Sequence, residues 1–165
     1  MELSLFRENF ARVPRHVAVL GLCKDNQIYG VTISSLQSVS VLERQQVLTF
    51  VLKKNSYFST ILIQEQKFTI NFLALNQMEI SKAYSDNNRV VGNRVEEKAW
   101  SSSEGNLGFV KGATFSISAT LINSVELEES NVFFVSAEQV IESNKTGMLL
   151  YCERSYGVFQ NWKNQ

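Results

Sequence analysis

Residues 30–40 read Gly-Val-Thr-Ile-Ser-Ser-Leu-Gln-Ser-Val-Ser, and this stretch decides which fold we expect. Side chains alternate between the two faces of a strand, so Thr32 and Ser34 project together while Val31 and Ile33 project into the opposite layer. Five hydroxyl side chains within nine residues, beside backbone exposed where the strand ends, could line a polar ligand. Composition alone favours a simpler interpretation, an edge strand followed by a serine-rich loop.

The segments on either side of this stretch are predicted to be short strands. An apolar run, then a turn at Asp25-Asn26-Gln27, then a second β-rich run predict a hairpin. Further on, segments rich in β-formers or alternating in polarity continue the pattern. The predicted strands are residues 17–22, 28–36, 47–52, 68–72, 114–121, 132–135 and 147–151.

Short helices are predicted between the strands. Residues 2–12 form an amphipathic helix that ends before Pro14, Asn55 or Ser56 caps a second helix, and Asn76 precedes a third. The polar connection 85–112 is long enough to carry short structure or a function of its own. We therefore expect one domain over residues 1–165, mainly β, an antiparallel barrel with short flanking helices.

Composition excludes several classes of function. Lysine plus arginine equals aspartate plus glutamate, 16 each, so no charge imbalance favours nucleic acid or an anionic membrane as partner. No apolar run approaches the ~20 residues that span a bilayer. Cys23 and Cys152 form no CxxC pair, and without a secretory signal we expect reduced thiols in the cytoplasm. A single histidine, His16, builds no histidine metal site, and no dinucleotide or P-loop glycine motif occurs.

Other polar residues suit an anionic or heteroaromatic ligand. Lys53-Lys54-Asn55-Ser56 lies between a strand end and a helix start, where unpaired N–H groups and lysines attract a phosphate. A solvated lysine turn with an ordinary N-cap is the alternative. Asn71, on the polar face of an apolar strand, could bind a ring edge or only the adjacent backbone. Tyr156 could cover a planar ligand or pack the C-terminal segment, and His16 is expected to be structural.

Taken together, these segments resemble the flavin reductase-like family of FMN-binding split barrels. Residues 30–40 match that family's GMTVSSFTSVS nearly residue for residue, and this is the specific part of the resemblance. The other matching segments occur along the chain in the same order as in the family. They are Phe6-Arg7, residues 13–19, 47–62, 68–73, 133–135 and 149–151.

The resemblance implies an antiparallel Greek-key split barrel that forms a homodimer, with FMN or FAD in a groove near the subunit interface. It implies NADH or NADPH as co-substrate and a reduced flavin that passes to an oxygenase component, a monooxygenase or a halogenase. The flavin carries the hydride chemistry, and no catalytic residue is assigned. The implied flavin-binding residues are Thr32, Ile33, Ser34, Ser35, Ser38, Val39, Ser40, Lys53, Lys54, Asn55, Ser56 and Asn71.

The departures from the family pattern concern mainly the nicotinamide side. The family's threonine-glycine before the first strand is Arg15-His16 here, and its proline-proline pair is Arg44-Gln45. Its C-terminal histidine-x-glycine-x-tyrosine pattern appears as residues 152–156, Cys-Glu-Arg-Ser-Tyr, which keeps only the tyrosine. His16, Cys152 and Tyr156 are therefore the nicotinamide-side candidates. The competing hypotheses are a flavoprotein that oxidises no nicotinamide, such as an electron carrier or an assembly partner, and a barrel-type interaction module.

Overall fold

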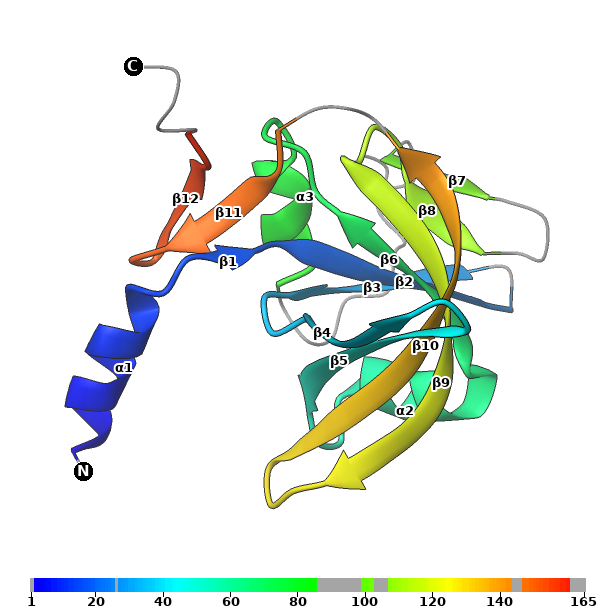
Figure 1. Cartoon of the computed structure of the whole chain (residues 1–165), viewed down its shortest axis with the longest axis horizontal. Coiled ribbons are helices and arrows are strands. Elements are labelled where there is room, and N and C mark those ends of the chain that lie inside the picture. The colour runs from blue at the N-terminus through cyan, green and yellow to red at the C-terminus, as the bar shows by residue number, and fades with distance from the viewer. Residues whose placement is uncertain (1, 26, 86–98, 103–106, 144–146, 161–165) are drawn as a thin grey trace.

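A computed structural model describes residues 2–25, 27–85, 99–102, 107–143 and 147–160 of the chain. Within them the backbone forms three short helices and a set of antiparallel strands (Figure 1). The helices are α1 (Leu3–Ala11), α2 (Tyr57–Glu65) and α3 (Met78–Ala83). The strands are β1 (Arg15–His16), β2 (Ala18–Lys24), β3 (Gln27–Ile33), β4 (Gln37–Leu42), β5 (Gln45–Lys53), β6 (Lys67–Phe72), β7 (Trp100–Ser102), β8 (Gly108–Val110), β9 (Phe115–Glu126), β10 (Ser130–Ser143), β11 (Leu149–Cys152) and β12 (Ser155–Val158).

The main sheet has seven strands in the order β3-β2-β6-β9-β10-β5-β4, and every neighbouring pair is antiparallel. β3 and β4 are consecutive in the chain yet stand at opposite edges of this sheet. The sheet curls around a core but leaves these two edges unpaired with each other, which is the split of the barrel. The predicted mainly β fold, with its split antiparallel barrel and flanking helices, is confirmed.

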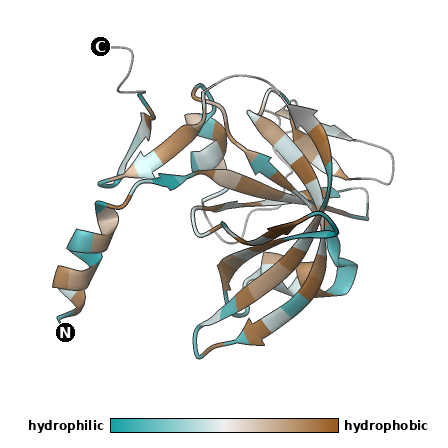
Figure 2. Cartoon of the chain, in the orientation of Figure 1, coloured by the Kyte–Doolittle hydropathy of each residue, from teal (hydrophilic) through white to brown (hydrophobic). Residues whose placement is uncertain are grey.

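Hydrophobic residues recur along the strands of the curled sheet (Figure 2), and the buried ones pack together as the core of the barrel. Phe50 stands at its centre, with Phe133 stacked on one side at 5.4 Å and Phe68 edge-on at 5.8 Å between ring centroids. The apolar face of α2 closes this core, as the positions of Phe58 and Ile61 predicted.

A second apolar cluster lies outside the barrel, between the sheet and α3. Tyr84 and Trp100 meet edge to face at 5.7 Å, and the indole Nε1 of Trp100 donates to the Tyr84 hydroxyl at 2.8 Å. Gly21 and Gly30 face each other in the β2–β3 hairpin and leave the room that these two rings occupy. This cluster fixes α3 against the edge of the sheet formed by β3.

The N-terminal and C-terminal segments form a unit that projects from the barrel (Figure 1). β1, β11 and β12 make a separate antiparallel sheet in the order β1-β11-β12, and α1 directly precedes β1 in the chain. The backbone N–H of Glu153 donates to the carbonyl of Ala11 at 2.7 Å, which ties the end of α1 to the β11–β12 turn. None of the described helices is long and apolar enough to cross a membrane.

Candidate functional site

A pocket of about 210 Å³ lies where the end of β3 meets α3 and the β11–β12 hairpin. Hydroxyl side chains dominate its wall, and none of the described lining residues is charged. The lining residues are Val17, Thr32, Ile33, Ser34, Ser81, Ser85, Tyr151 and Tyr156. Such a wall offers hydrogen-bond donors and acceptors to a neutral polar ring edge and apolar surface to its faces.

Thr32 and Ser34 project together toward this pocket, as the alternation of residues 30–34 predicted. Both are half-buried, whereas Val31 and Ile33 are buried in the barrel core. The Thr32 backbone N–H donates to the carbonyl of Tyr84 at 2.8 Å, and its Oγ1 donates to the carbonyl of Ser81, also at 2.8 Å. The hydroxyl hydrogen of Thr32 is thus engaged with α3, and its oxygen lone pairs remain to accept from a ligand.

The rest of the serine-rich stretch leaves the pocket and joins the opposite edge of the sheet. Ser35 bonds to the β5 backbone: its Oγ accepts from Val51 N at 3.1 Å and donates to Val51 O at 3.3 Å. Ser38, Val39 and Ser40 lie in β4, the first two exposed and Ser40 half-buried. The stretch therefore spans the split of the barrel, with Ser35 holding β5 close to the end of β3.

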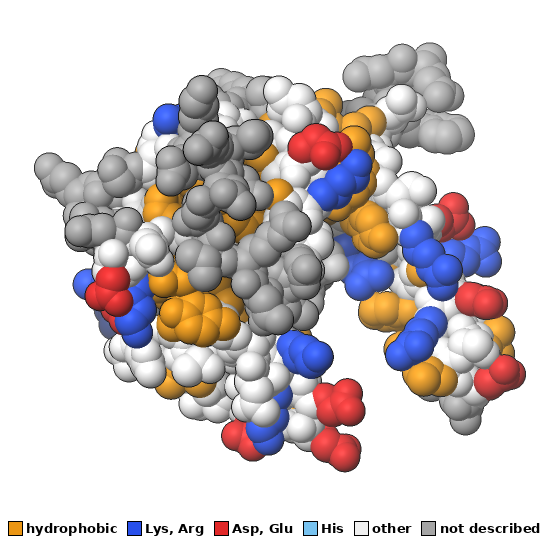
Figure 3. All heavy atoms as spheres, turned by 180° about the vertical axis from the view of Figure 1, so that it is seen from behind, with side chains coloured by type: hydrophobic (Ala, Val, Ile, Leu, Met, Phe, Trp, Pro, Cys, Tyr) orange, Lys and Arg blue, Asp and Glu red, His pale blue; other side chains and the backbone are white. Residues whose placement is uncertain are grey.

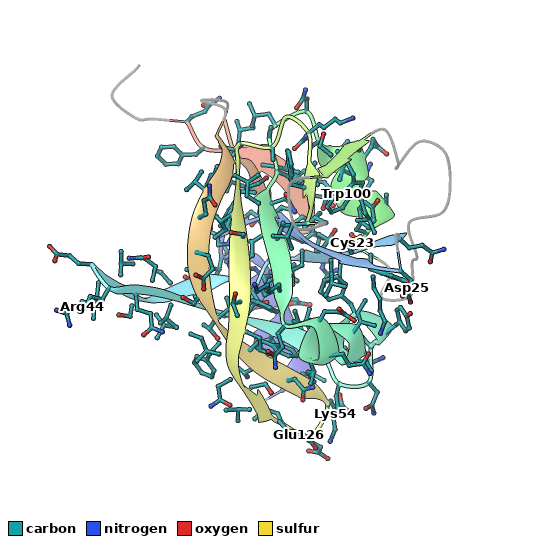
Figure 4. The ribbon with its side chains drawn as sticks, turned by 90° about the vertical axis from the view of Figure 1, so that its right-hand side faces the viewer. Cys23, Asp25, Arg44, Lys54, Trp100 and Glu126 are labelled. Atoms are coloured by element: carbon teal, nitrogen blue, oxygen red, sulfur yellow. The ribbon has the colours of Figure 1, made fainter. Side chains whose placement is uncertain are left out.

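Lys53 to Ser56 form a second corner, at the N-terminal end of α2. Ser56 is the N-cap, its Oγ accepting from the Ser59 backbone N–H at 3.2 Å, so the predicted cap is confirmed. Asn55 adopts the left-handed conformation, with φ of 62°, which asparagine tolerates. Lys53 is exposed, whereas the Lys54 ammonium forms an ion pair with Glu126 (Figure 4).

Asn71 is fully buried and its amide is engaged within the protein. Nδ2 donates to the carbonyl of Val19 at 2.9 Å and to Oγ1 of Thr69 at 3.0 Å. Oδ1 accepts from the backbone N–H of Val110 at 2.9 Å and from Oγ of Ser116 at 2.8 Å. These bonds support the structural interpretation of Asn71, and we leave it out of the proposed binding site.

Of the three nicotinamide-side candidates, Tyr156 is the one that lines the pocket. Its hydroxyl lies 2.9 Å from Oγ of Ser81, and its ring meets Tyr151 edge to face at 5.2 Å. The His16 ring packs instead against Phe72 at 5.4 Å. Cys152 donates its thiol hydrogen to the carbonyl of Arg12 at 3.3 Å, in the contact between the hairpin and the end of α1.

Burial of His16 gives a pH dependence that can be measured. Desolvation lowers its pKa from 6.5, and its Nε2 is buried without a hydrogen-bond partner among the described residues. Below about pH 6.5 the unfolded chain therefore binds a proton at His16 that the folded protein does not bind. The free energy of unfolding falls with pH in this range, until the pH reaches the lower pKa of His16 in the folded protein. We expect His16→Phe to lose less stability than the wild type between about pH 7.5 and about pH 5.5. Urea midpoints at both pH values test this, and an equal loss in both proteins would contradict it.

Ser81, Ser85 and Tyr151 are pocket residues that were not predicted. Ser81 and Ser85 are four residues apart and share one face of α3 and its end, but small polar residues at this spacing carry no signal by themselves. Tyr151 belongs to a predicted strand and faces Tyr156 across the hairpin, a partner that lies in a strand the sequence did not indicate. Their role depends on how α3 and the hairpin pack against β3.

Comparisons with known proteins agree with this architecture. The model of the "Flavin reductase like domain" family matches residues 10–160. The flavin reductase component BorF of a bacterial two-component tryptophan halogenase superposes with a TM-score of 0.84 at 14% identity, covering 97% of this chain and 99% of that one. Comparison with the curated proteins gives no match.

Two further solved structures are similar over most of their length. The styrene monooxygenase flavin reductase from Pseudomonas putida S12 gives a TM-score of 0.80 at 18% identity, covering 94% of this chain and 98% of that one. The NADH:FAD oxidoreductase SgcE6 from Streptomyces globisporus C-1027, in complex with NAD and FAD fragments, gives a TM-score of 0.82 at 16% identity. The match covers 95% of this chain and 92% of that one. At these identities the structures show that the fold is shared.

Proposed function

The chain belongs to the flavin reductase-like family, and from that premise we propose that it is an NAD(P)H-dependent flavin reductase. One observation carries the proposal: the pocket joins the family's specific strand, here Thr32 to Ser34, to Tyr156, the residue kept from its C-terminal pattern. The flavin, FMN or FAD, supplies the hydride chemistry when it is bound, and NADH or NADPH is the reductant. The protein's part is to bind, orient and shield the two rings.

The residues present fit a flavin. Thr32 and Ser34 offer hydroxyl oxygens to a ring edge, while Val17 and Tyr151 offer apolar and aromatic surface. The pocket is smaller than the ~300–1,000 Å³ typical of ligand sites, so it holds one part of the molecule. We propose that the remainder follows the split of the barrel, past Ser35 and Ser38, toward the start of α2.

The corner at the start of α2 suits the phosphate. Ser56 N donates to the carbonyl of Lys53 and Ser59 N to Oγ of Ser56, at 3.2 Å each, so among the described residues the N–H groups of Tyr57 and Phe58 are left at the open end of the helix. These N–H groups and the positive end of the helix dipole attract an anion. Lys53, exposed beside them, adds its charge, and Lys54 adds less because Glu126 neutralises it.

We expect Lys53→Glu to weaken FMN binding about tenfold while riboflavin, which lacks the phosphate, changes by less than about twofold. Lys54→Glu should also weaken FMN binding, but by less, because the Lys54 ammonium is already paired with Glu126. Fluorescence titration with FMN and with riboflavin measures the two dissociation constants, and their ratio in each variant is compared with the wild type.

Lys67→Glu is the matched control, with the same change of charge at the opposite end of α2. The nine residues of α2 separate the two positions by about 13 Å, beyond the screening length of about 8 Å at physiological salt. Equal losses of FMN and riboflavin in Lys53→Glu, or equal losses of FMN in Lys53→Glu and Lys67→Glu, would place the phosphate elsewhere.

A homodimer is part of the proposal, and the projecting α1 supports it. α1 has no buried residue, and Leu3, Phe6 and Phe10 are about half exposed. A helix of nine residues is marginal in water unless an apolar face packs against another surface. Figure 3 shows apolar side chains among the charged ones along this projecting unit. We propose that a second copy covers them; sedimentation velocity measures the state directly.

Steady-state oxidation of NADH and of NADPH with added FMN or FAD tests the function. The proposal predicts turnover with at least one pair and fails if none supports it. Flavin binding without turnover would instead support a flavoprotein that oxidises no nicotinamide, the alternative favoured by residues 152–155. We propose further that an oxygenase component consumes the reduced flavin, and that the protein works in the cytoplasm, where its unpaired Cys23 and Cys152 stay reduced.

A further inference from the structure

Ser81 connects three parts of the pocket wall, although it is a small residue on a short helix. It is buried, 1% exposed, and lies near the C-terminal end of α3. Its carbonyl belongs to the last turn, where intrahelical donors run out, and the Ser85 N–H donates to Lys82 O instead. Two hydroxyls satisfy the Ser81 carbonyl: Thr32 Oγ1 at 2.8 Å and Ser85 Oγ at 2.7 Å.

The contact from Thr32 fixes the backbone of Ser81 to the end of β3, and the contact from Ser85 completes the bonding of the same carbonyl within the end of α3. The side chain of Ser81 then extends the connection across the pocket, because its Oγ lies 2.9 Å from the Tyr156 hydroxyl. Hydrogen-bonded groups thus run from Thr32 on β3, through the carbonyl and hydroxyl of Ser81 on α3, to Tyr156 on β12. All three residues line the pocket.

Tyr156 needs such a tie because its strand is remote from the main sheet. β12 is the outer strand of the small sheet and, among the described strands, pairs with β11 alone; it belongs to the unit that projects from the barrel. The neighbouring Tyr151 packs against the Tyr156 ring at 5.2 Å but belongs to the same hairpin, so it cannot fix the hairpin relative to α3. The Leu149 N–H donates to the Leu73 carbonyl and anchors the start of β11, whereas the Ser81–Tyr156 hydrogen bond ties β12 itself to α3.

We propose that Ser81 is a positioning residue: it holds the Tyr156 ring at a fixed distance from the flavin ring edge bound at Thr32 and Ser34, and so sets the width of the slot between them that the nicotinamide ring enters. This rests on the proposed function. Ser81 acts through Tyr156, so its loss should weaken use of the nucleotide and leave flavin binding unchanged.

A double-mutant cycle of Ser81→Ala and Tyr156→Phe tests the proposal. Each substitution removes one partner of the same hydrogen bond, so each should raise KM for the nucleotide about three- to tenfold, with flavin Kd within about twofold. The double variant should be no worse than the more affected single variant, because the bond can be lost once. Tyr29→Phe, which removes a tyrosine hydroxyl bonded to Gln27 Oε1 outside the pocket, is the control and should leave KM unchanged.

Hydrogen exchange of the β12 amides provides a second readout that needs no turnover. Ser81→Ala and Tyr156→Phe should each speed exchange at Tyr156 and its neighbours in β12 while Val31 in β3 keeps its protection. Unchanged exchange in β12, or KM effects that multiply in the double variant, would overturn the role of Ser81. Absence of turnover in the wild type would overturn the proposed function instead, and the exchange data would then still decide whether Ser81 holds the hairpin.

Discussion

Replacing Asn71 by alanine is expected to lower the free energy of unfolding by about 3–5 kcal/mol. Asn71 has no exposed surface, and its amide pairs the carbonyl of Val19, the backbone N–H of Val110 and the hydroxyl of Ser116. Alanine leaves these groups buried without a hydrogen-bond partner. Each one destabilises the folded protein, because in the unfolded chain it would be hydrogen-bonded to water. Urea unfolding at an unchanged m-value measures the loss.

Asn123→Ala is the control for this variant. Asn123 lies in β9 of the same sheet, is exposed, and its Oδ1 accepts only from the next backbone N–H in the described structure, at 2.8 Å. We expect a change within about 0.5 kcal/mol there. If Asn71→Ala were as stable as Asn123→Ala but lost flavin affinity, Asn71 would be a ligand residue and our structural assignment would be wrong.

Gly30→Ala is expected to cost about 2–3 kcal/mol and to weaken flavin binding as well. A Cβ at Gly30 would lie 2.6 Å from Cδ1 and 3.2 Å from Cγ of Tyr84. These atoms are close to the point where the ring joins the backbone, and the ring is buried, so a change of rotamer cannot relieve the clash. At the other end of the ring, the Tyr84 hydroxyl accepts a hydrogen bond from Nε1 of Trp100. The ring must therefore move together with the end of α3, whose Tyr84 carbonyl pairs the Thr32 N–H at the pocket.

Gly157→Ala separates this clash from a general effect of alanine. A Cβ at Gly157 meets nothing within 4 Å, so the substitution should leave thermal stability within about 0.5 kcal/mol of the wild type. Thermal unfolding and FMN titration of both variants test the prediction. A Gly30→Ala protein with wild-type stability and wild-type flavin affinity would show that Tyr84 does not couple β3 to the pocket.

Local patterns predicted most of the fold. Residues 28–33, 47–52 and 68–72 are strands because apolar and β-branched side chains alternate or cluster there, and Ser56 caps α2 because a hydroxyl precedes an apolar helical face. β4 was missed because its residues are polar or exposed, and only pairing with β5 makes it a strand. β12 was missed because its hairpin turn uses Glu153 and Arg154, at φ of 50° and 60°, where asparagine and glycine are usual.

The candidate site was predicted in part, for a physical reason. Thr32, Ser34 and Tyr156, which line the pocket, could be predicted because they belong to motifs, each readable within a few residues. The partners that change the meaning of a residue lie far away in sequence: Glu126 is 72 residues from the Lys54 that it neutralises, and Ser81 is 75 from Tyr156. Such pairs depend on how the sheet curls and on where α3 docks, which no local pattern carries.

Anaerobic mixing of the purified, flavin-loaded protein with NADH, and separately with NADPH, tests the central claim most directly. The visible absorbance of oxidised flavin reports hydride transfer within the pocket without interference from oxygen or from a partner protein. We predict that at least one nucleotide bleaches the flavin faster than it bleaches free flavin at the same concentration. A folded, flavin-loaded protein whose absorbance neither nucleotide changes faster than in the free-flavin control would contradict the assignment as a flavin reductase.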